Sequence, residues 1–191
     1  MFQSFKGSSK GIFALSTLFW LLLLVISRVV PHLANFSLFP VAVICLSSCE
    51  KKLYCALMSI VALFISDLIL PGSGLFALNL YPMFGMWDIF TYSGLLCWTV
   101  AGARVDWQGR FANPVGWSVL SAVSFWLWTN FGTWLISSIY SHDFNGFFAC
   151  YLAAIPFLQR SLIPIIICIC GLHLSGRYLR SKGIIILGTR Q

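Results

Sequence analysis

Long apolar runs, separated by short polar breaks, dominate the chain. The first five runs are residues 11–30, 36–49, 53–70, 83–102 and 115–139. Because a transmembrane helix uses about 20 mostly apolar residues, we interpret each run as a span, the second being short. The breaks hold charged residues and turn signals, of which Pro71-Gly72-Ser73-Gly74 is the clearest. This pattern predicts an all-α integral membrane protein.

The last apolar stretch, residues 146–176, is too long for one ordinary span and is interrupted by Pro156, Arg160 and Pro164. Its first part, residues 146–158, would make a helix of about 20 Å, which is short of a membrane core of about 30 Å. We therefore expect a re-entrant or interfacial half-helix there, followed by a sixth span over residues 161–178. A single long helix kinked by proline is the alternative.

The N-terminus begins like a signal peptide, with two lysines before a leucine-rich core. No small-residue cleavage site follows the core, and Arg28 stands there instead, so an uncleaved first span is expected. The predicted organisation is a cytoplasmic N-terminus over residues 1–10, one six-helix transmembrane domain over 11–178, and a basic cytoplasmic tail over 179–191.

Composition narrows the possible classes further. The 191 residues are 59% hydrophobic and 9% charged, with a mean hydropathy of +0.89. Soluble domains carry about 25% charged residues. These values exclude a soluble globular domain, a disordered chain and a nucleic-acid-binding domain. The spans leave no room for a separate soluble catalytic domain.

The basic residues predict the orientation of the spans. The chain carries 12 Lys and Arg against 5 Asp and Glu, for a net charge of +7. With both termini inside, ten of the twelve basic residues lie on the inner side, and only Arg28 and Arg160 lie on the outer side. The positive-inside rule therefore predicts an N-in, C-in topology. A full span over residues 146–158 would reverse the C-terminus, which is why we expect a half-helix there.

Catalytic and cofactor signals are weak. The seven cysteines lie in or beside apolar runs without a C-x-x-C pair, so we interpret them as packing residues rather than as metal ligands or a disulfide framework. His142-Asp143 lacks an accompanying G-x-S-x-G or H-E-x-x-H motif, and no glycine-rich phosphate loop is present. We expect no enzymatic activity, no metal and no cofactor.

The predicted topology gathers several polar residues in the outer half of the membrane. Arg28 and Asp67 are opposite charges at similar depth, and Arg160 is a second cation there. A charge at a helix centre costs about 2.5–3.5 kcal/mol on insertion scales, so it usually faces a partner or a cavity. One interpretation is an outward-facing pocket for a small polar or anionic ligand. The other is a structural Arg28–Asp67 pair, with Arg160 reaching the lipid headgroups.

Asn130 lies among aromatic residues in the fifth run, within Trp126-Leu127-Trp128-Thr129-Asn130-Phe131-Gly132-Thr133-Trp134. Its amide is suited either to a ligand or to a bridge between helices. The aromatic residues are suited equally to a belt at the membrane interface. Both interpretations remain open from the sequence.

These pieces resemble a family of small bacterial membrane proteins of unknown function, which look like substrate-binding (S) components of energy-coupling factor (ECF) transporters. The matching pieces are Arg28-x-x-Pro31-x-x-x-Asn35-Phe36, Ser66-Asp67-Leu68, Thr129-Asn130-Phe131-Gly132-x-x-Trp134, Tyr140 with Gly146, and Cys150-Tyr151-x-x-Ala154-Ile155-Pro156-Phe157. The resemblance implies a multi-pass protein of the bacterial cytoplasmic membrane. It also implies capture of a vitamin or similar micronutrient from outside.

The resemblance further implies docking on a membrane coupling subunit driven by two ATPases. That docking often uses an A-x-x-x-A pattern in the first helix, whereas Ala14 is followed here by Leu18. The expected outer site consists of Arg28, Asn35, Asp67, Asn130 and Trp134, closed by Tyr151 and Arg160 from the half-helix side. The alternative function is a non-transporting membrane scaffold or assembly protein, whose polar cluster only holds helices together.

Overall fold

The computed structural model describes residues 6–29, 38–69 and 85–182, with side chains in the first helix described from Leu15 onward. All regular structure in these ranges is helical. The six helices are α1 (Lys6–Val29), α2 (Phe39–Cys49), α3 (Lys52–Ile69), α4 (Met86–Gly102), α5 (Ala112–Ile136) and α6 (Phe144–Ser181). The predicted helical class is confirmed, and the first five helices fall on the five apolar runs.

Three of the helices, α3, α5 and α6, are long and apolar enough to cross a membrane. The helix α2 is apolar but has only 11 residues, which gives a length of about 16 Å. That is about half of a membrane core. Most of α2 is also buried inside the protein, namely Phe39, Val41, Ala42, Val43, Ile44, Leu46 and Ser47. The second apolar run therefore forms a central packing element, which α1, α3, α4 and α6 contact.

The separate half-helix predicted over residues 146–158 is wrong. The chain forms one helix, α6, that runs unbroken from Phe144 to Ser181 through both prolines. At 38 residues it is about 57 Å long, almost twice the thickness of a membrane core. The long helix that the sequence left as the alternative is the one observed.

The helix α6 runs through two prolines, and two side-chain hydrogen bonds lie near the first of them. A proline inside a helix removes one N–H donor and clashes with the preceding turn. Near Pro156, the indole Nε1 of Trp126 donates to the Ala154 carbonyl at 3.0 Å. The Ser161 hydroxyl donates to the Phe157 carbonyl at 3.0 Å. Neither bond reaches the Leu152 carbonyl, which is the one that Pro156 leaves without its helical donor, so both bonds reinforce the backbone beside the proline without replacing the lost one.

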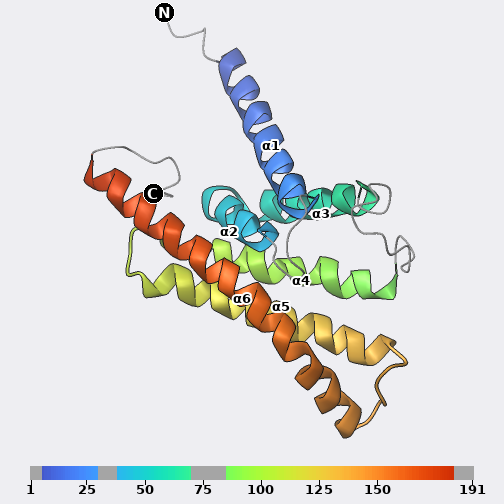
Figure 1. Ribbon diagram of the computed structural model, residues 1–191. Coiled ribbons are helices and arrows are strands. Elements are labelled where there is room, and N and C mark those ends of the chain that lie inside the picture. Colours follow the sequence, from blue (N-terminus) through green and yellow to red (C-terminus); the bar gives the residue numbers. More distant parts are fainter. Residues whose placement is uncertain (1–5, 30–37, 70–84, 183–191) are drawn as a thin grey trace, which may run out of the picture.

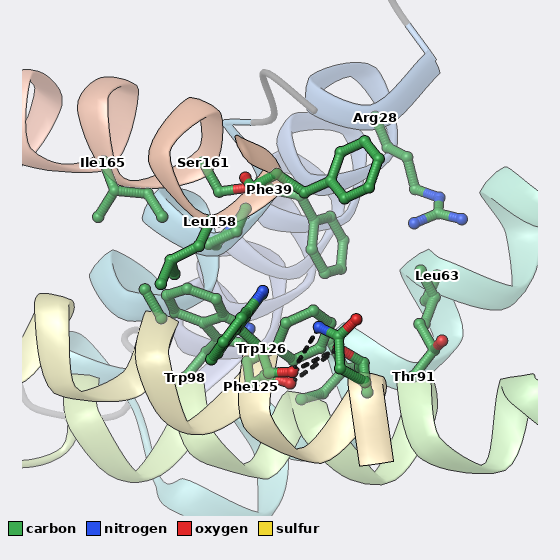
Figure 2. Close-up of a pocket in the computed structure, with 16 residues that line it drawn as sticks. Arg28, Phe39, Leu63, Thr91, Trp98, Phe125, Trp126, Leu158, Ser161 and Ile165 are labelled. Carbon is green, nitrogen blue, oxygen red and sulfur yellow. Dashed lines mark hydrogen bonds between the residues drawn. The ribbon is translucent and has the colours of Figure 1, made fainter. Parts of the chain in front are cut away.

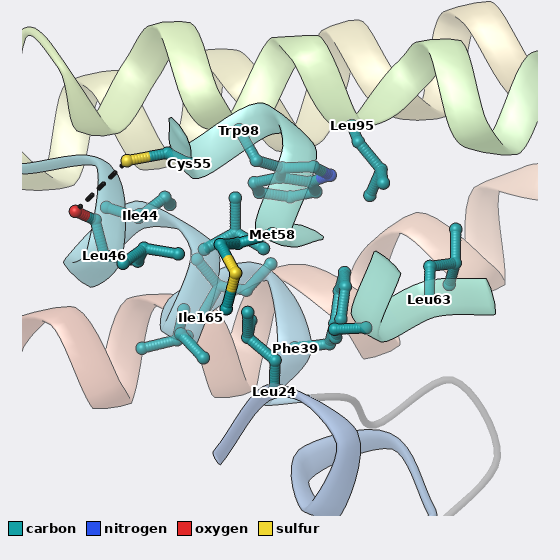
Figure 3. Packing of buried hydrophobic residues seen from close by; sticks show 14 of the residues in the cluster. Leu24, Phe39, Ile44, Leu46, Cys55, Met58, Leu63, Leu95, Trp98 and Ile165 are labelled. Atoms are coloured by element: carbon teal, nitrogen blue, oxygen red, sulfur yellow. Dashed lines mark hydrogen bonds between the residues drawn. The ribbon is translucent and has the colours of Figure 1, made fainter. Parts of the chain in front are cut away.

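The helices pack around α2 (Figure 1). The helices α4 and α5 form the most extensive contact, followed by α5 and α6, while α2 lies between α4, α3 and α6. The helix α1 contacts α2 and α3 and projects away from the rest, as its exposed apolar side chains also indicate. Figure 3 shows the buried cluster, in which Phe39, Ile44 and Leu46 of α2 meet Leu24, Met58, Trp98 and Ile165 of other helices.

The C-terminal part of α6 packs against the loop between α4 and α5. The Arg180 guanidinium donates to the Trp107 carbonyl at 2.9 Å. The ring of His173 is 1% exposed and lies edge-on to Phe111, with 5.6 Å between ring centroids. These contacts fix the C-terminal part of α6 to the segment that connects α4 with α5.

Candidate functional site

A cavity of about 420 Å³ opens between the helices, and all six contribute to its lining (Figure 2). Its volume falls in the range of about 300–1,000 Å³ that is typical of small-molecule sites. The lining residues are Arg28, Phe39, Pro40, Leu63, Thr91, Leu95, Trp98, Ala122, Phe125, Trp126, Thr129, Asn130, Phe157, Leu158, Ser161 and Ile165. Arg28 is the only charged residue among them.

Arg28 and Asp67 form the ion pair that the sequence suggested. The Arg28 Nη2 donates to Asp67 Oδ1 at 2.5 Å, and the side chains are 31% and 15% exposed. Tyr92 of α4 donates its hydroxyl to Asp67 Oδ2 at 2.9 Å. Both carboxylate oxygens of Asp67 are thus held, and three helices meet at this carboxylate.

Arg28 is less completely satisfied than Asp67. Among the described residues, its one hydrogen-bond partner is Asp67, and its buried Nε has no partner. Asp67 does not line the cavity, whereas Arg28 does. The cavity therefore meets the cation directly, with the compensating carboxylate behind it.

Three other polar side chains in the lining use their hydrogens within the fold. Thr91 donates to the Trp87 carbonyl at 3.3 Å, and Thr129 donates to the Phe125 carbonyl at 3.0 Å. Asn130 Nδ2 donates to the Trp126 carbonyl at 2.8 Å. Their side-chain oxygens accept no hydrogen bond from the described residues. These positions consequently offer acceptors to the cavity.

Aromatic and aliphatic side chains form most of the remaining wall. Figure 2 places Arg28 at one end of the cavity and Trp98 and Ile165 at the other, with Phe39 between them. The ring of Trp98 lies 5.6 Å from that of Phe125, measured between centroids. The cavity is therefore amphipathic along its length, with a cationic end and an apolar end.

Trp134 and Tyr151, which the sequence placed in the site, lie outside the lining. The Trp134 Nε1 donates to the Ser141 carbonyl at 3.0 Å, in the turn between α5 and α6. The Tyr151 hydroxyl donates to the Leu127 carbonyl at 2.8 Å, and its ring packs edge-on against Trp126. Both residues hold the α5–α6 hairpin, and Tyr151 supports the cavity wall through Trp126.

Of the seven predicted site residues, the structure brings Arg28 and Asn130 to the cavity, with Asp67 behind Arg28. Arg160 is exposed on α6 and does not line it. Asn35 lies outside the described residues. Sequence reasoning missed Tyr92, which holds Asp67, because a single tyrosine in an apolar run carries no motif.

The turn before α6 is built around Asp143. Its carboxylate accepts from the Gly146 backbone N–H and from the Ser141 hydroxyl, both at 2.7 Å. These two hydrogen bonds lower the pKa of Asp143 below its ordinary value. Asp143 is therefore the N-cap of α6. Across the described ranges, no three His, Cys, Asp or Glu side chains come together as a metal site requires.

Comparison with known proteins gives a family without an assigned function. The family of unknown function DUF6580 matches residues 9–180, nearly the whole chain, so the chain belongs to it. No curated protein and no solved structure matches. The match does not connect the chain to ECF S components.

Proposed function

We propose that this member of a family of unknown function is a membrane-embedded substrate-binding protein. It would take up a vitamin or similar micronutrient from the outer side of a bacterial cytoplasmic membrane. The observation that carries the proposal is the 420 Å³ cavity, with Arg28 at one end and aromatic and aliphatic walls beyond it. A cation at membrane depth that one carboxylate only partly satisfies is a functional-site hypothesis by default.

Six spans with both termini inside belong to the same proposal. Three of the six described helices are long enough to cross, α2 would need α1 to complete its crossing, and the distribution of basic residues supports the orientation. An ECF-type coupling subunit with two ATPases is one source of energy for such a protein. A solitary carrier is the other.

The first test is a cavity-filling variant. Ser161 lines the cavity from α6, so Ser161→Trp would occupy ligand space. Ser175 lies on the same helix but is exposed outside the lining, so Ser175→Trp is the matched control. Each protein is purified in native lipid discs, and small molecules released on denaturation are identified by mass spectrometry. We expect one compound to be retained by wild type and Ser175→Trp and lost from Ser161→Trp; equal retention by all three would refute the proposal.

The same purification identifies protein partners. Two ATPases and a membrane coupling subunit in stoichiometric amounts would support an S-component role. Recovery of the chain alone would favour a solitary carrier.

A membrane scaffold is the second candidate, and one observation favours it. The polar atoms of Trp134 and Tyr151, together with the Asp67 carboxylate, are all engaged inside the fold. Under this function Ser161→Trp would leave cell growth and any bound protein unchanged, and no small molecule would be found with wild type.

A further inference from the structure

We infer that the cavity is selective for a small monoanion with a flat apolar body, whose carboxylate binds Arg28. This inference rests on the proposed function and names the chemical class of its substrate. It follows from three features of the cavity. These are the Arg28 guanidinium, the acceptor oxygens of the polar side chains, and the apolar character of the remaining wall.

Arg28 and Asp67 are satisfied to different degrees within their ion pair. Asp67 receives donors from both Arg28 and Tyr92, while Arg28 gives only one hydrogen bond among the described residues. Arg28 faces the cavity and Asp67 does not. An anion at the cavity end would thus meet an incompletely used guanidinium without having to displace the carboxylate. A second cation would meet repulsion instead.

The charges around the cavity also limit the number of anionic groups that a ligand can carry. Among the described residues of the lining Arg28 is the only cation, and its remaining guanidinium donors can serve one carboxylate. A second anionic group on the ligand would lie in the apolar end with no cation to pair with. Burying such a charge without a partner is costly. The site is therefore suited to one carboxylate and no more.

The wall determines the rest of the molecule. Away from Arg28 the lining is largely aromatic and aliphatic, with Trp98 and Ile165 at the far end. Flat rings pack well against such a wall, in offset or edge-on contact. Thr91, Thr129 and Asn130 offer acceptor oxygens along the way. A ring that carries an N–H group is therefore favoured over one that carries none.

The test compares two acids with their uncharged amides. The probes are indole-3-acetate, indole-3-acetamide, 1-naphthaleneacetate and 1-naphthaleneacetamide, titrated calorimetrically into the full chain in lipid discs. The acid and amide of each pair share one shape and differ in charge. Because hydrogen bonds to charged groups are about twice as strong as neutral ones, we expect each acid to bind at least about tenfold more tightly than its amide. Indole-3-acetate should bind more tightly than 1-naphthaleneacetate.

The variants assign that selectivity to Arg28. The double variant Arg28→Gln, Asp67→Asn removes both charges together, so no unpaired charge is left buried. In this variant the ratio of acid to amide affinity should fall to about one. Ser161→Trp should abolish binding of all four probes, and Ser175→Trp should leave it unchanged. Retention of native mass and helical circular dichroism shows that each variant is folded.

Three results would overturn the inference. These are amides that bind as tightly as acids, acid selectivity that survives in the double variant, and no binding of either acid to wild type. In each case the proposed function is judged separately by the native compound. If Ser161→Trp releases a neutral or cationic compound, the substrate class is wrong while substrate binding stands.

Discussion

Arg28 and Asp67 lie on different helices, 39 residues apart in sequence. Their ion pair places two opposite charges between otherwise apolar helices. Each side chain is mostly shielded, at 31% and 15% exposed. Removing one partner of a buried pair leaves the other charge uncompensated. Removing both avoids that penalty. The pair is therefore a sharp test of whether charge here serves the fold or the cavity.

We expect Arg28→Gln and Asp67→Asn singly to lower the free energy of unfolding by about 3 kcal/mol, at the lower end for buried pairs because Arg28 is partly exposed. The double variant should be no less stable than either single variant. Thermal unfolding in matched detergent gives the coupling energy. Additive losses would mean that the two charges do not depend on each other.

Gly102 lies where α4 crosses α2. A Cβ at this position would come within 2.7 Å of the Ser47 Cβ and closer still to the Ile44 carbonyl. Because backbone atoms cannot give way easily, we expect Gly102→Ala to destabilise the protein by about 1–3 kcal/mol. Gly116 of α5 has open space around the added methyl, so Gly116→Ala is the control and should be neutral. Equal melting temperatures for the two variants would contradict this close approach.

At the scale of elements, α6 decides much of the architecture. It begins at a cap that a carboxylate supplies, continues through two prolines, and ends against the α4–α5 loop. The lowered pKa of Asp143 makes the cap sensitive to acid. Its stabilising contribution is present above the pKa of an unfolded aspartate and is lost as the pH falls through the lower, folded value.

We therefore expect Asp143→Ala to lower the melting temperature at pH 7, and the difference from wild type to shrink as the pH is lowered toward 3. Asp143→Asn keeps a capping oxygen and should lie between the two at pH 7. A melting-temperature difference that stays constant from pH 7 to pH 3 would show that the Asp143 charge does not stabilise α6.

At the scale of the whole molecule, membrane topology is the open prediction. The helices α3, α5 and α6 are long enough to cross, while α2 alone is not. Lys51 lies in the short link between α2 and α3, and Lys52 is the first residue of α3. If α1 and α2 together return the chain to the inner side, these lysines lie inside, as the positive-inside rule requires.

Two reporters check this arrangement. A green fluorescent protein fused after Gln191 should be fluorescent if the C-terminus lies inside, because this reporter matures in the cytoplasm. Alkaline phosphatase inserted at the turn before α6, between Ser141 and His142, should be active on the outer side. A dark C-terminal fusion together with active phosphatase there would mean that the number of crossings after the turn is even.

Some of the predicted site residues lie at the cavity and others do not. Arg28 and Asp67 stand out because charge is costly in apolar runs, and their pairing is one of the two interpretations that the sequence allows. Asn130 stands out among aromatic residues and lies in the cavity. Trp134 and Tyr151 stand out for the same reason but serve the α5–α6 hairpin. A motif identifies an unusual residue, and it does not say which way the side chain points.

By itself, the sequence determined the helical class, the positions of five apolar helices and the presence of two opposite charges within apolar runs, because hydropathy can be read along the chain. Tertiary structure decided the rest. It joined residues 144–181 into one helix that passes through both prolines and packs along α5. It buried α2 at the centre and brought Tyr92 to Asp67. It also placed Arg28, and not Asp67, on the cavity, because which atoms face a common space depends on how all six helices pack.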